Sequence, residues 1–469
     1  MWLKKICILL ILSILIVLYS LNIGMFSDNV LFASKMGNAL FQSGIFNWGS
    51  IPLEIDPGHP PFLATLMAVG WTLFGKSLVV SHLMMLPFVF GLMWQLVSFI
   101  SFFVKDKFLI ICSFLLVIAD PTLLSNLVLV NVEIIQLFFF FVAINAILRS
   151  NSFFKIVGLA LLSVVSYRGM MLCGGVFIID AVMHIVFKKR TIKSFFTEQR
   201  ILEYSVAALP AVIYLIWRLL TKGWIISNPL EIWGSAWHYS TVQEFLNNFF
   251  RNIIVLVQRF IDFGRLIPLL FVAITLFIKR KSLKWAEISP LIIIFFFSTI
   301  VIYVISLLIN NPMGHRYFLP SYLAMGLLSF LLIREYNAKK TIYGILLGCL
   351  ILGNLIVYPD RFAQGWDASL AHLPYWNLRK DAIRYMDDRG LSVAETASFF
   401  PNSTSIDNID LNGDMRSFIS FTGSEKYVLY SNVYNLSDED YDVLQNEYRI
   451  LKTFERFNVR IELMQKICN

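Results

Sequence analysis

The sequence predicts an all-α polytopic membrane protein with about 11 transmembrane helices (by apolar run length), followed by a small C-terminal α/β domain. Hydrophobic residues make up 57% of the 469 residues and charged residues only 15%. Apolar runs of membrane-spanning length recur throughout residues 1–358, and a soluble domain with so few charges would not stay soluble. We therefore expect a transmembrane domain over residues 1–358 and a second domain over residues 359–469.

Eleven apolar runs define the predicted spans. The first run is too long for the apolar part of a signal peptide, and no small-residue cleavage site follows it. We therefore expect an uncleaved first span. The runs cover residues 6–24, 78–103, 108–122, 127–148, 154–171, 172–187, 202–221, 253–278, 287–309, 317–333 and 341–358.

Basic connections alternate with connections that are poor in Lys and Arg. Short loops rich in these residues stay in the cytoplasm. All of the basic loops fall on one side of the predicted topology, together with Lys4 and Lys5. This predicts a multi-pass protein of the cytoplasmic membrane with a cytoplasmic N-terminus and an extracytoplasmic C-terminal domain. The basic loops are residues 105–107, 149–155, 188–193, 279–284 and 334–340.

The net charge of +8 is unevenly distributed. Residues 1–358 carry 27 basic and 14 acidic side chains, whereas residues 359–469 carry 12 and 17. The positive excess thus belongs to membrane loops, so we expect no nucleic-acid partner.

Two outer segments are long. The first outer loop, residues 25–77, contains apolar residues at helical spacing over 27–44, which predicts a helix along the membrane surface. The second, residues 222–252, is rich in aromatic residues, which favour the membrane interface. An alternative for these rings is stacking against a sugar. They are Trp224, Trp233, Trp237 and Tyr239.

The C-terminal domain shows both helical and strand patterns. We expect a helix that ends at Gly390 and another that begins after Ser437, a good N-cap followed by acidic residues. The stretches "KYVLYSN" and "VRIELMQK" read as strands.

Ionisable side chains at membrane depth are costly and need a reason. In the predicted topology they gather near the outer face. Asp180 and Asp262 lie deeper and have no assigned role. The residues at the outer face are Asp28, Glu54, Asp56, His59, Asp120, Glu133, Arg168, His315 and Arg316.

A mixed cluster of acids and arginines at the outer leaflet suits sugar transfer from a lipid phosphate. A carboxylate takes the proton of an acceptor hydroxyl as general base. Arginine holds the phosphate leaving group in a bidentate way. Nearby carboxylates stabilise the oxocarbenium character of the transition state. No nucleotide is needed, and the sequence has no glycine loop that would cradle one.

Four motifs follow one another along the chain. They are an acid after the first span (Asp28), "HPPFLATLMAVGWTLFG" from His59, an acid in the fourth span after "ADPTLLSNLVLVNV" (Glu133), and "HRYFLP" from His315. This order resembles integral-membrane glycosyltransferases of the GT-C class, in particular the protein O-mannosyltransferase and aminoarabinose-transferase group. The resemblance does not extend to the C-terminal domain.

The resemblance implies a polyprenyl-phosphate-linked sugar donor and inversion at the anomeric carbon. Asp28 is then the expected catalytic base. The group commonly has an Asp-Glu pair where this chain has "SDN", and an Asp where it has Glu133. The stretch "GWDAS" from Gly365 is only superficially similar to the WWD-type motif of oligosaccharyltransferases, and we interpret it as chance. The expected substrate-binding residues are Asp56, His59, Glu133, Arg168, His315, Arg316 and Tyr317.

Structural roles stay open for several of these residues. Asp28 can cap the surface helix, and Asp56 fits a turn in "DPG". His59, which Pro60 keeps extended, can orient its loop. Glu133 can pair with Arg168 inside the membrane, and Arg316 can extend to the interface.

We therefore expect a membrane glycosyltransferase whose acceptor is a glycolipid, a glycan or a protein. The alternatives are a transporter or flippase for lipid-linked glycans, favoured by Asp180 and Asp262, and a non-catalytic assembly protein. Against transport, the chain shows no internal repeat. We expect no cofactor. A divalent metal stays open as an alternative, but no His/Cys spacing in the sequence predicts a metal site.

Overall fold

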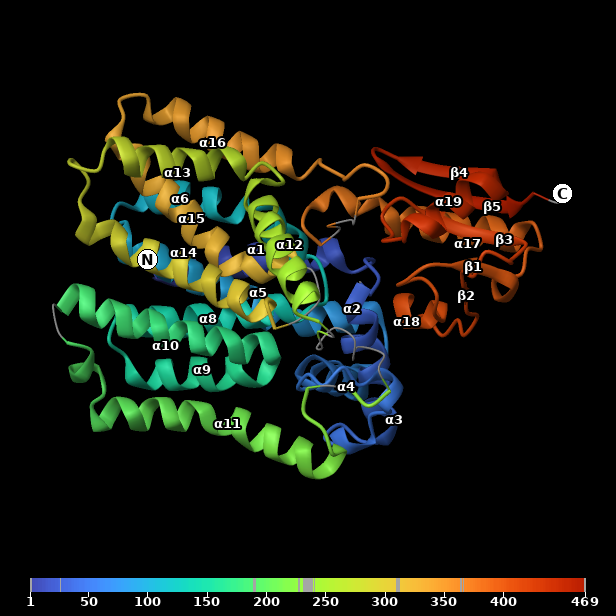
Figure 1. Ribbon diagram of the computed structural model, residues 1–469, viewed down its shortest axis with the longest axis horizontal. Coiled ribbons are helices and arrows are strands. Elements are labelled where there is room, and N and C mark those ends of the chain that lie inside the picture. The colour runs from blue at the N-terminus through green and yellow to red at the C-terminus, as the bar shows by residue number, and fades with distance from the viewer. Residues whose placement is uncertain are drawn as a thin grey trace.

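The computed structural model describes residues 2–25, 27–188, 191–226, 228–230, 239, 241–308, 313–362, 365 and 367–467. A bundle of long helices forms one part of the molecule, and a mixed α/β unit of C-terminal residues adjoins one end of it (Figure 1). The predicted fold class is therefore confirmed: apolar helices followed by a small sheet of five strands.

Each of the eleven predicted spans coincides with a helix or a bent helix pair. Within the described residues, five helices are long and apolar enough to cross a membrane, or up to seven if each bent pair is one span. The elements of the bundle are α1 (Trp2–Ser20), α5 (Leu78–Phe103), α6 (Lys107–Ile118), α7 (Pro121–Leu127), α8 (Val132–Leu148), α9 (Ser152–Val165), α10 (Tyr167–Lys188), α11 (Glu198–Lys222), α12 (Val242–Ile261), α13 (Leu266–Ile278), α14 (Trp285–Ser306), α15 (Leu319–Leu332) and α16 (Lys339–Gly353).

Two breaks differ from the predicted spans. The run 253–278 is not one straight helix, because α12 and α13 meet at 95°. At their junction Phe263 and Gly264 have φ of 52° and 80°, and a Cβ on Gly264 would lie 2.0 Å from the Cys349 carbonyl oxygen. The bend therefore needs glycine there. The break between α9 and α10 lies at Ser166, earlier than predicted, and the Ser166 hydroxyl accepts the Gly169 amide of the next helix.

A second bend of 82° separates α6 from α7. Asp120 stands at this bend and caps α7: its carboxylate accepts the backbone amides of Thr122 and Leu123 at 3.0 and 3.1 Å. Pro121 occupies the first helical position, where no amide donor is needed. The bend turns the start of α7 toward the residues that follow α16.

The first loop is helical where its apolar spacing predicted a helix. The short α2 (Ser27–Asn29), a π-helical stretch η1 (Val30–Lys35) and α3 (Met36–Ser43) follow one another. After two 3₁₀ turns, Pro60 and Pro61 lead into α4 (Phe62–Phe74). The two segments pack together through Trp71, which is buried against Gly37.

The C-terminal unit has a sheet in the order β2-β1-β3-β5-β4. Strand β1 runs parallel to β2 and β3, and the other pairings are antiparallel. The two predicted helices and two predicted strands are confirmed as α17, α19, β3 and β5, whereas β4 and the short β1 and β2 were not predicted. The elements are α17 (Pro374–Asp388), β1 (Thr396–Ser398), α18 (Ile406–Asp410), β2 (Ile419–Ser420), β3 (Tyr427–Ser431), α19 (Asp438–Glu447), β4 (Tyr448–Arg456) and β5 (Val459–Lys466).

The first loop and the C-terminal unit contact each other directly. The Met25 amide donates to the Ile409 carbonyl at 2.8 Å, and Lys76 pairs with Asp407 at 2.6 Å. Figure 1 shows α18 beside α2. We call the end of the bundle where these two parts meet the capped end.

Candidate functional site

A buried guanidinium, that of Arg316, lies among three carboxylates at the capped end. Its Nε is 3.1 Å from Glu133 and its Nη1 is 3.2 Å from Asp367, while Nη2 donates to Asp28. Arg316 belongs to the 3₁₀ turn η6 (His315–Phe318), and its partners come from α2, from α8 and from the segment after α16. Four parts of the chain therefore converge on one cation.

Arg168, at the start of α10, completes the group. Its Nη1 donates to Glu133 at 2.7 Å, which is the ion pair foreseen as a structural alternative, and its guanidinium lies 4.0 Å from the Tyr317 ring centroid. Arg168 makes no further hydrogen bond to the described residues. The N–H groups of its Nε and Nη2 therefore have no acceptor among them. We call Asp28, Glu133, Arg168, Arg316 and Asp367 the Arg316 cluster.

Local structure explains why a buried acid is tolerated on α8. Glu133 lies in the first turn of this helix, where the exposed amide ends favour a negative charge. The Asn131 side chain caps the turn by accepting the Ile134 amide at 3.2 Å. With two guanidiniums beside it, the Glu133 carboxylate is compensated although its side chain is only 3% exposed.

Asp28 is the acid of the cluster that solvent reaches. Its side chain is 31% exposed, against 3% for Glu133 and 12% for Asp367. The alternative role of helix cap is not observed, because Asp28 lies inside α2 and its carboxylate is directed to Arg316. Asp28 is therefore the most accessible carboxylate of the cluster.

His59 lies next to the cluster as a neutral ring. Burial, aided by the nearby charges of Arg168 and Arg218, lowers the pKa of His59 to about 3. The Tyr167 backbone amide donates to Nδ1 at 3.2 Å, so the ring proton sits on Nε2. His59 and Arg168 line the same small cavity. His59 therefore offers a ligand one neutral N–H donor and no positive charge.

Asp56 is held in a separate ion pair. Its Oδ1 accepts the Gly58 amide and Nη2 of Arg218, both at 2.9 Å, and both charged side chains are buried. Tyr214 of α11 donates to the Gly58 carbonyl at 2.9 Å. These contacts fix the "DPG" turn to α11, which supports the structural role foreseen for Asp56.

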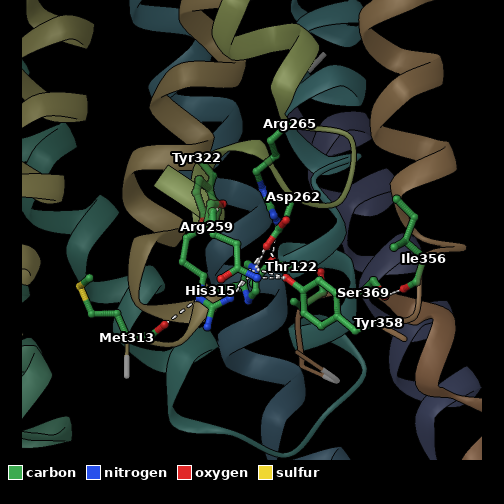
Figure 2. A network of polar contacts seen from close by, with 12 residues as sticks. Thr122, Arg259, Asp262, Arg265, Met313, His315, Tyr322, Ile356, Tyr358 and Ser369 are labelled. Carbon is green, nitrogen blue, oxygen red and sulfur yellow. Dashed lines mark hydrogen bonds and ion pairs between the residues drawn. The ribbon is translucent and has the colours of Figure 1, made fainter. Parts of the chain in front are cut away.

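His315 belongs to a second polar centre, in which it lies close to Arg259, Asp262 and Tyr358 (Figure 2). Its Nε2 lies 3.1 Å from Asp262, which also accepts the Tyr358 hydroxyl. Arg259 approaches the same carboxylate at 3.8 Å and donates to the Met313 carbonyl at 2.8 Å. His315 therefore contacts Asp262, although the adjacent Arg316 contacts Asp28.

A buried pair stands beside this second centre. Arg265 donates from Nε and Nη2 to the two oxygens of Asp120 at 2.8 and 2.9 Å, and its guanidinium lies 4.0 Å from the Tyr322 ring centroid. The Arg265 side chain is wholly buried. This pair ties the α12–α13 bend to the α6–α7 bend.

Asp180 belongs to neither centre. It pairs with Lys155 at 3.4 Å and accepts the Tyr204 hydroxyl at 2.7 Å, while Lys155 also pairs with Glu203 at 2.5 Å. Asp180 is twelve residues after Arg168 on α10, which is roughly 18 Å along a helix. The network therefore lies far from the capped end.

Asp367 is the cluster residue that sequence reasoning missed. It lies in the "GWDAS" stretch, whose similarity to a known motif was interpreted as chance. The Asp367 carbonyl accepts the Asn126 side chain at 3.0 Å and the Ala368 carbonyl accepts the Thr122 hydroxyl at 3.1 Å, so α7 holds this stretch in place. The sequence signal that could have identified Asp367 is its position as an acidic residue soon after the last predicted span.

Two further expectations concern aromatic residues and metals. Trp224 lies over the Arg218 guanidinium at 3.9 Å, whereas Trp233 and Trp237 fall outside the described residues. Among the residues described, no group of three or more His, Cys, Asp and Glu side chains is arranged to hold a metal ion.

Comparison with known proteins shows the fold. No family model and no curated protein sequence matches the chain. Two crystal structures do match: ArnT from Cupriavidus metallidurans in the apo state, with a TM-score of 0.53, and the same protein bound to undecaprenyl phosphate, with 0.51. Each match covers 98% of both chains at 12% sequence identity. The chain therefore shares the GT-C-type fold of ArnT over nearly its whole length, including the C-terminal unit.

Proposed function

We propose that this protein is a membrane glycosyltransferase. In this proposal it moves a sugar from a polyprenyl-phosphate donor to an acceptor hydroxyl at the outer face of the cytoplasmic membrane. The observation that carries the proposal is the partly exposed Asp28 carboxylate, which accepts a hydrogen bond from Arg316 and lies in the same cluster as Arg168. The fold shared with ArnT, one structure of which holds undecaprenyl phosphate, gives independent support.

Asp28 acts as the general base in the proposed reaction. Its carboxylate accepts the proton of the acceptor hydroxyl while the hydroxyl oxygen forms a bond to the anomeric carbon. The bond from that carbon to the phosphate oxygen breaks, and its electron pair stays on the phosphate. A single displacement of this kind inverts the anomeric configuration. Arg316 orients Asp28 by donating a hydrogen bond to its carboxylate.

Arg168 is the first contact for the phosphate. Its Nε and Nη2 are free toward the described residues, and a guanidinium can bind two phosphate oxygens at once. Tyr317 stacks on Arg168 and fixes its plane. His59, a neutral donor on the same cavity, adds a hydrogen bond without adding charge.

The transport alternative finds less support in the geometry. Asp180 and Asp262, the acids that favoured it, both have partners: Lys155 and Tyr204 for the first, His315 and Tyr358 for the second. Their burial thus has a structural reason, and we propose no transport function.

Turnover by the purified full-length protein tests the proposal. The protein is mixed in detergent with a polyprenyl-phosphate-linked sugar and with glycolipid, glycan or protein acceptors in separate reactions. We expect release of polyprenyl phosphate with one class of acceptor, and a product of inverted configuration by NMR. If no class of acceptor promoted release, or if the configuration were retained, the proposed single displacement would be wrong.

A further inference from the structure

Each nitrogen of the Arg316 guanidinium faces a carboxylate in this structure. Nη2 donates a hydrogen bond to Asp28, while Nε and Nη1 lie 3.1 and 3.2 Å from Glu133 and Asp367, and Nε makes no hydrogen bond among the described residues. The side chain is only 9% exposed, so a phosphate that binds this guanidinium competes with the carboxylates around it.

The space around the guanidiniums leads to the same conclusion. The cavity lined by Arg168, Arg316, Glu133 and Tyr317 has a volume of about 10 Å³, which is room for roughly one water molecule. A phosphate group is several times larger. Binding between the two arginines therefore requires a side chain to move out.

The charge of the Arg316 cluster points the same way. Three carboxylates stand against two guanidiniums, so the cluster is negative before any ligand binds. A phosphate adds further negative charge in a site of low solvent exposure, where repulsion is strong. Moving one carboxylate away from the arginines relieves this repulsion.

Asp367 differs from the other two carboxylates in how it contacts the arginines. Glu133 accepts a hydrogen bond from Arg168, and Asp28, the proposed base, accepts one from Arg316. The Asp367 carboxylate lies 3.2 Å from Arg316 without a hydrogen bond to another side chain among the described residues, although α7 holds its backbone. Burial raises the pKa of Asp367, which disfavours its charge.

We propose that Asp367 is a stand-in for the substrate phosphate. In the free protein its carboxylate occupies the position on Nη1 of Arg316 that the phosphate of the polyprenyl-phosphate donor takes on binding. The phosphate displaces Asp367, and Asp367 returns as polyprenyl phosphate leaves. Asp367 is thus a positioning residue that favours product release. This inference rests on the proposed function.

Binding of polyprenyl phosphate to the purified full-length protein provides the test. Asp367→Asn keeps the shape of the side chain and removes the competing charge. We expect Asp367→Asn to bind polyprenyl phosphate about tenfold more tightly than wild type (the effect of removing one close like charge) and to show a lower KM for the donor with a lower kcat. Asp367→Ser, which also lacks the charge, should do the same.

Two controls separate charge from structure. Asp360→Asn lies in the same segment but removes a carboxylate that pairs with Arg460, so it should leave the affinity unchanged. Polyprenol of equal chain length should bind wild type and Asp367→Asn alike, because it has no phosphate. A tightening for polyprenol as large as that for polyprenyl phosphate would show that the charge is not the cause.

The outcomes distinguish this inference from the proposed function. Suppose that wild type binds polyprenyl phosphate and that both Asp367 variants bind it no more tightly than wild type does. The displacement of Asp367 by the phosphate would then be wrong, while the glycosyltransferase proposal would stand. If wild type does not bind polyprenyl phosphate at all, both are overturned.

Discussion

Arg316 contacts Asp28, whereas the adjacent His315, on the same 3₁₀ turn, contacts Asp262. One short turn therefore joins two polar centres that have different partners. The first centre contains the proposed base, and the second adjoins the Arg265–Asp120 pair, which ties two helix bends together. Substitutions at neighbouring positions should consequently have different effects.

Asp28→Asn should remove the proposed base while keeping the size of the side chain. We expect kcat to fall by about 10²–10⁴-fold, the usual contribution of a general base. The measurement is release of polyprenyl phosphate in the presence of acceptor. Asp106→Asn, which alters an exposed cap of α6, is the matched control and should retain activity. Comparable turnover in Asp28→Asn would contradict the assignment.

Arg168→Lys should weaken donor binding although it keeps the charge. Lysine cannot bind two phosphate oxygens from one planar group, nor stack on Tyr317 as arginine does. We expect KM for the donor to rise by about tenfold, in line with the loss of one charge-assisted hydrogen bond. Arg149→Lys, at an exposed arginine that lies outside the cluster, should leave KM unchanged.

His315→Gln and Arg316→Lys should separate stability from turnover. The polar contacts of His315 lie in the second centre, where it contacts Asp262. His315→Gln should therefore lower the melting temperature more than the activity. Arg316→Lys loses the fork that reaches three carboxylates, and kcat should fall by about 10-fold or more. Thermal melting and turnover of both variants check this, and equal loss of activity in the two would contradict it.

Arg265→Ala should destabilise the protein strongly. It leaves the Asp120 carboxylate buried without its bidentate partner, which typically costs about 3–5 kcal/mol. Replacing both residues, as in Asp120→Asn with Arg265→Met, should cost less than the single change because no buried charge is left. The melting temperatures in detergent decide this, and an additive double variant would argue against direct coupling.

His59 should make the protein less stable in acid. Its folded pKa, about 3, lies below the value of 6.5 for a free histidine, so below pH 6.5 the unfolded chain takes up a proton that the folded chain does not. Stability attributable to His59 is therefore present above pH 6.5 and is lost progressively as the pH falls toward 3. His59→Gln should lose less melting temperature between pH 7 and 4 than wild type. If the melting temperatures of wild type and His59→Gln fell in parallel with pH, this prediction would be wrong.

Much of the fold could be predicted because it depends on local patterns. Run length and loop charge located the helices of the bundle, and a cap at Ser437 and a stop at Gly390 located helices of the C-terminal unit. The bend at Gly264 could not be predicted in this way. It depends on a positive φ and on the close approach of Cys349, which is distant in sequence.

The site was only partly predictable for a similar reason. Asp28, Glu133, Arg168 and Arg316 were selected by type and membrane depth, and the structure brings them together. The partners of Asp56 and Arg316 could not be read from the chain, because Arg218 and Asp367 reach them only through tertiary packing. A sequence motif thus identifies an acidic residue and the chemistry it can perform, but it does not identify the residue with which the acid pairs.

The order in which the Arg316 cluster is synthesised has a consequence for assembly in the membrane. Asp28 precedes its partner Arg316 by 288 residues, and Asp367 comes later still. While the early helices insert, Glu133 has Arg168 nearby, but Asp28 has no counter-ion. The centre can therefore form only after the last helices have entered the bilayer, so a ribosome-bound or truncated chain should be inactive however well its first helices are inserted.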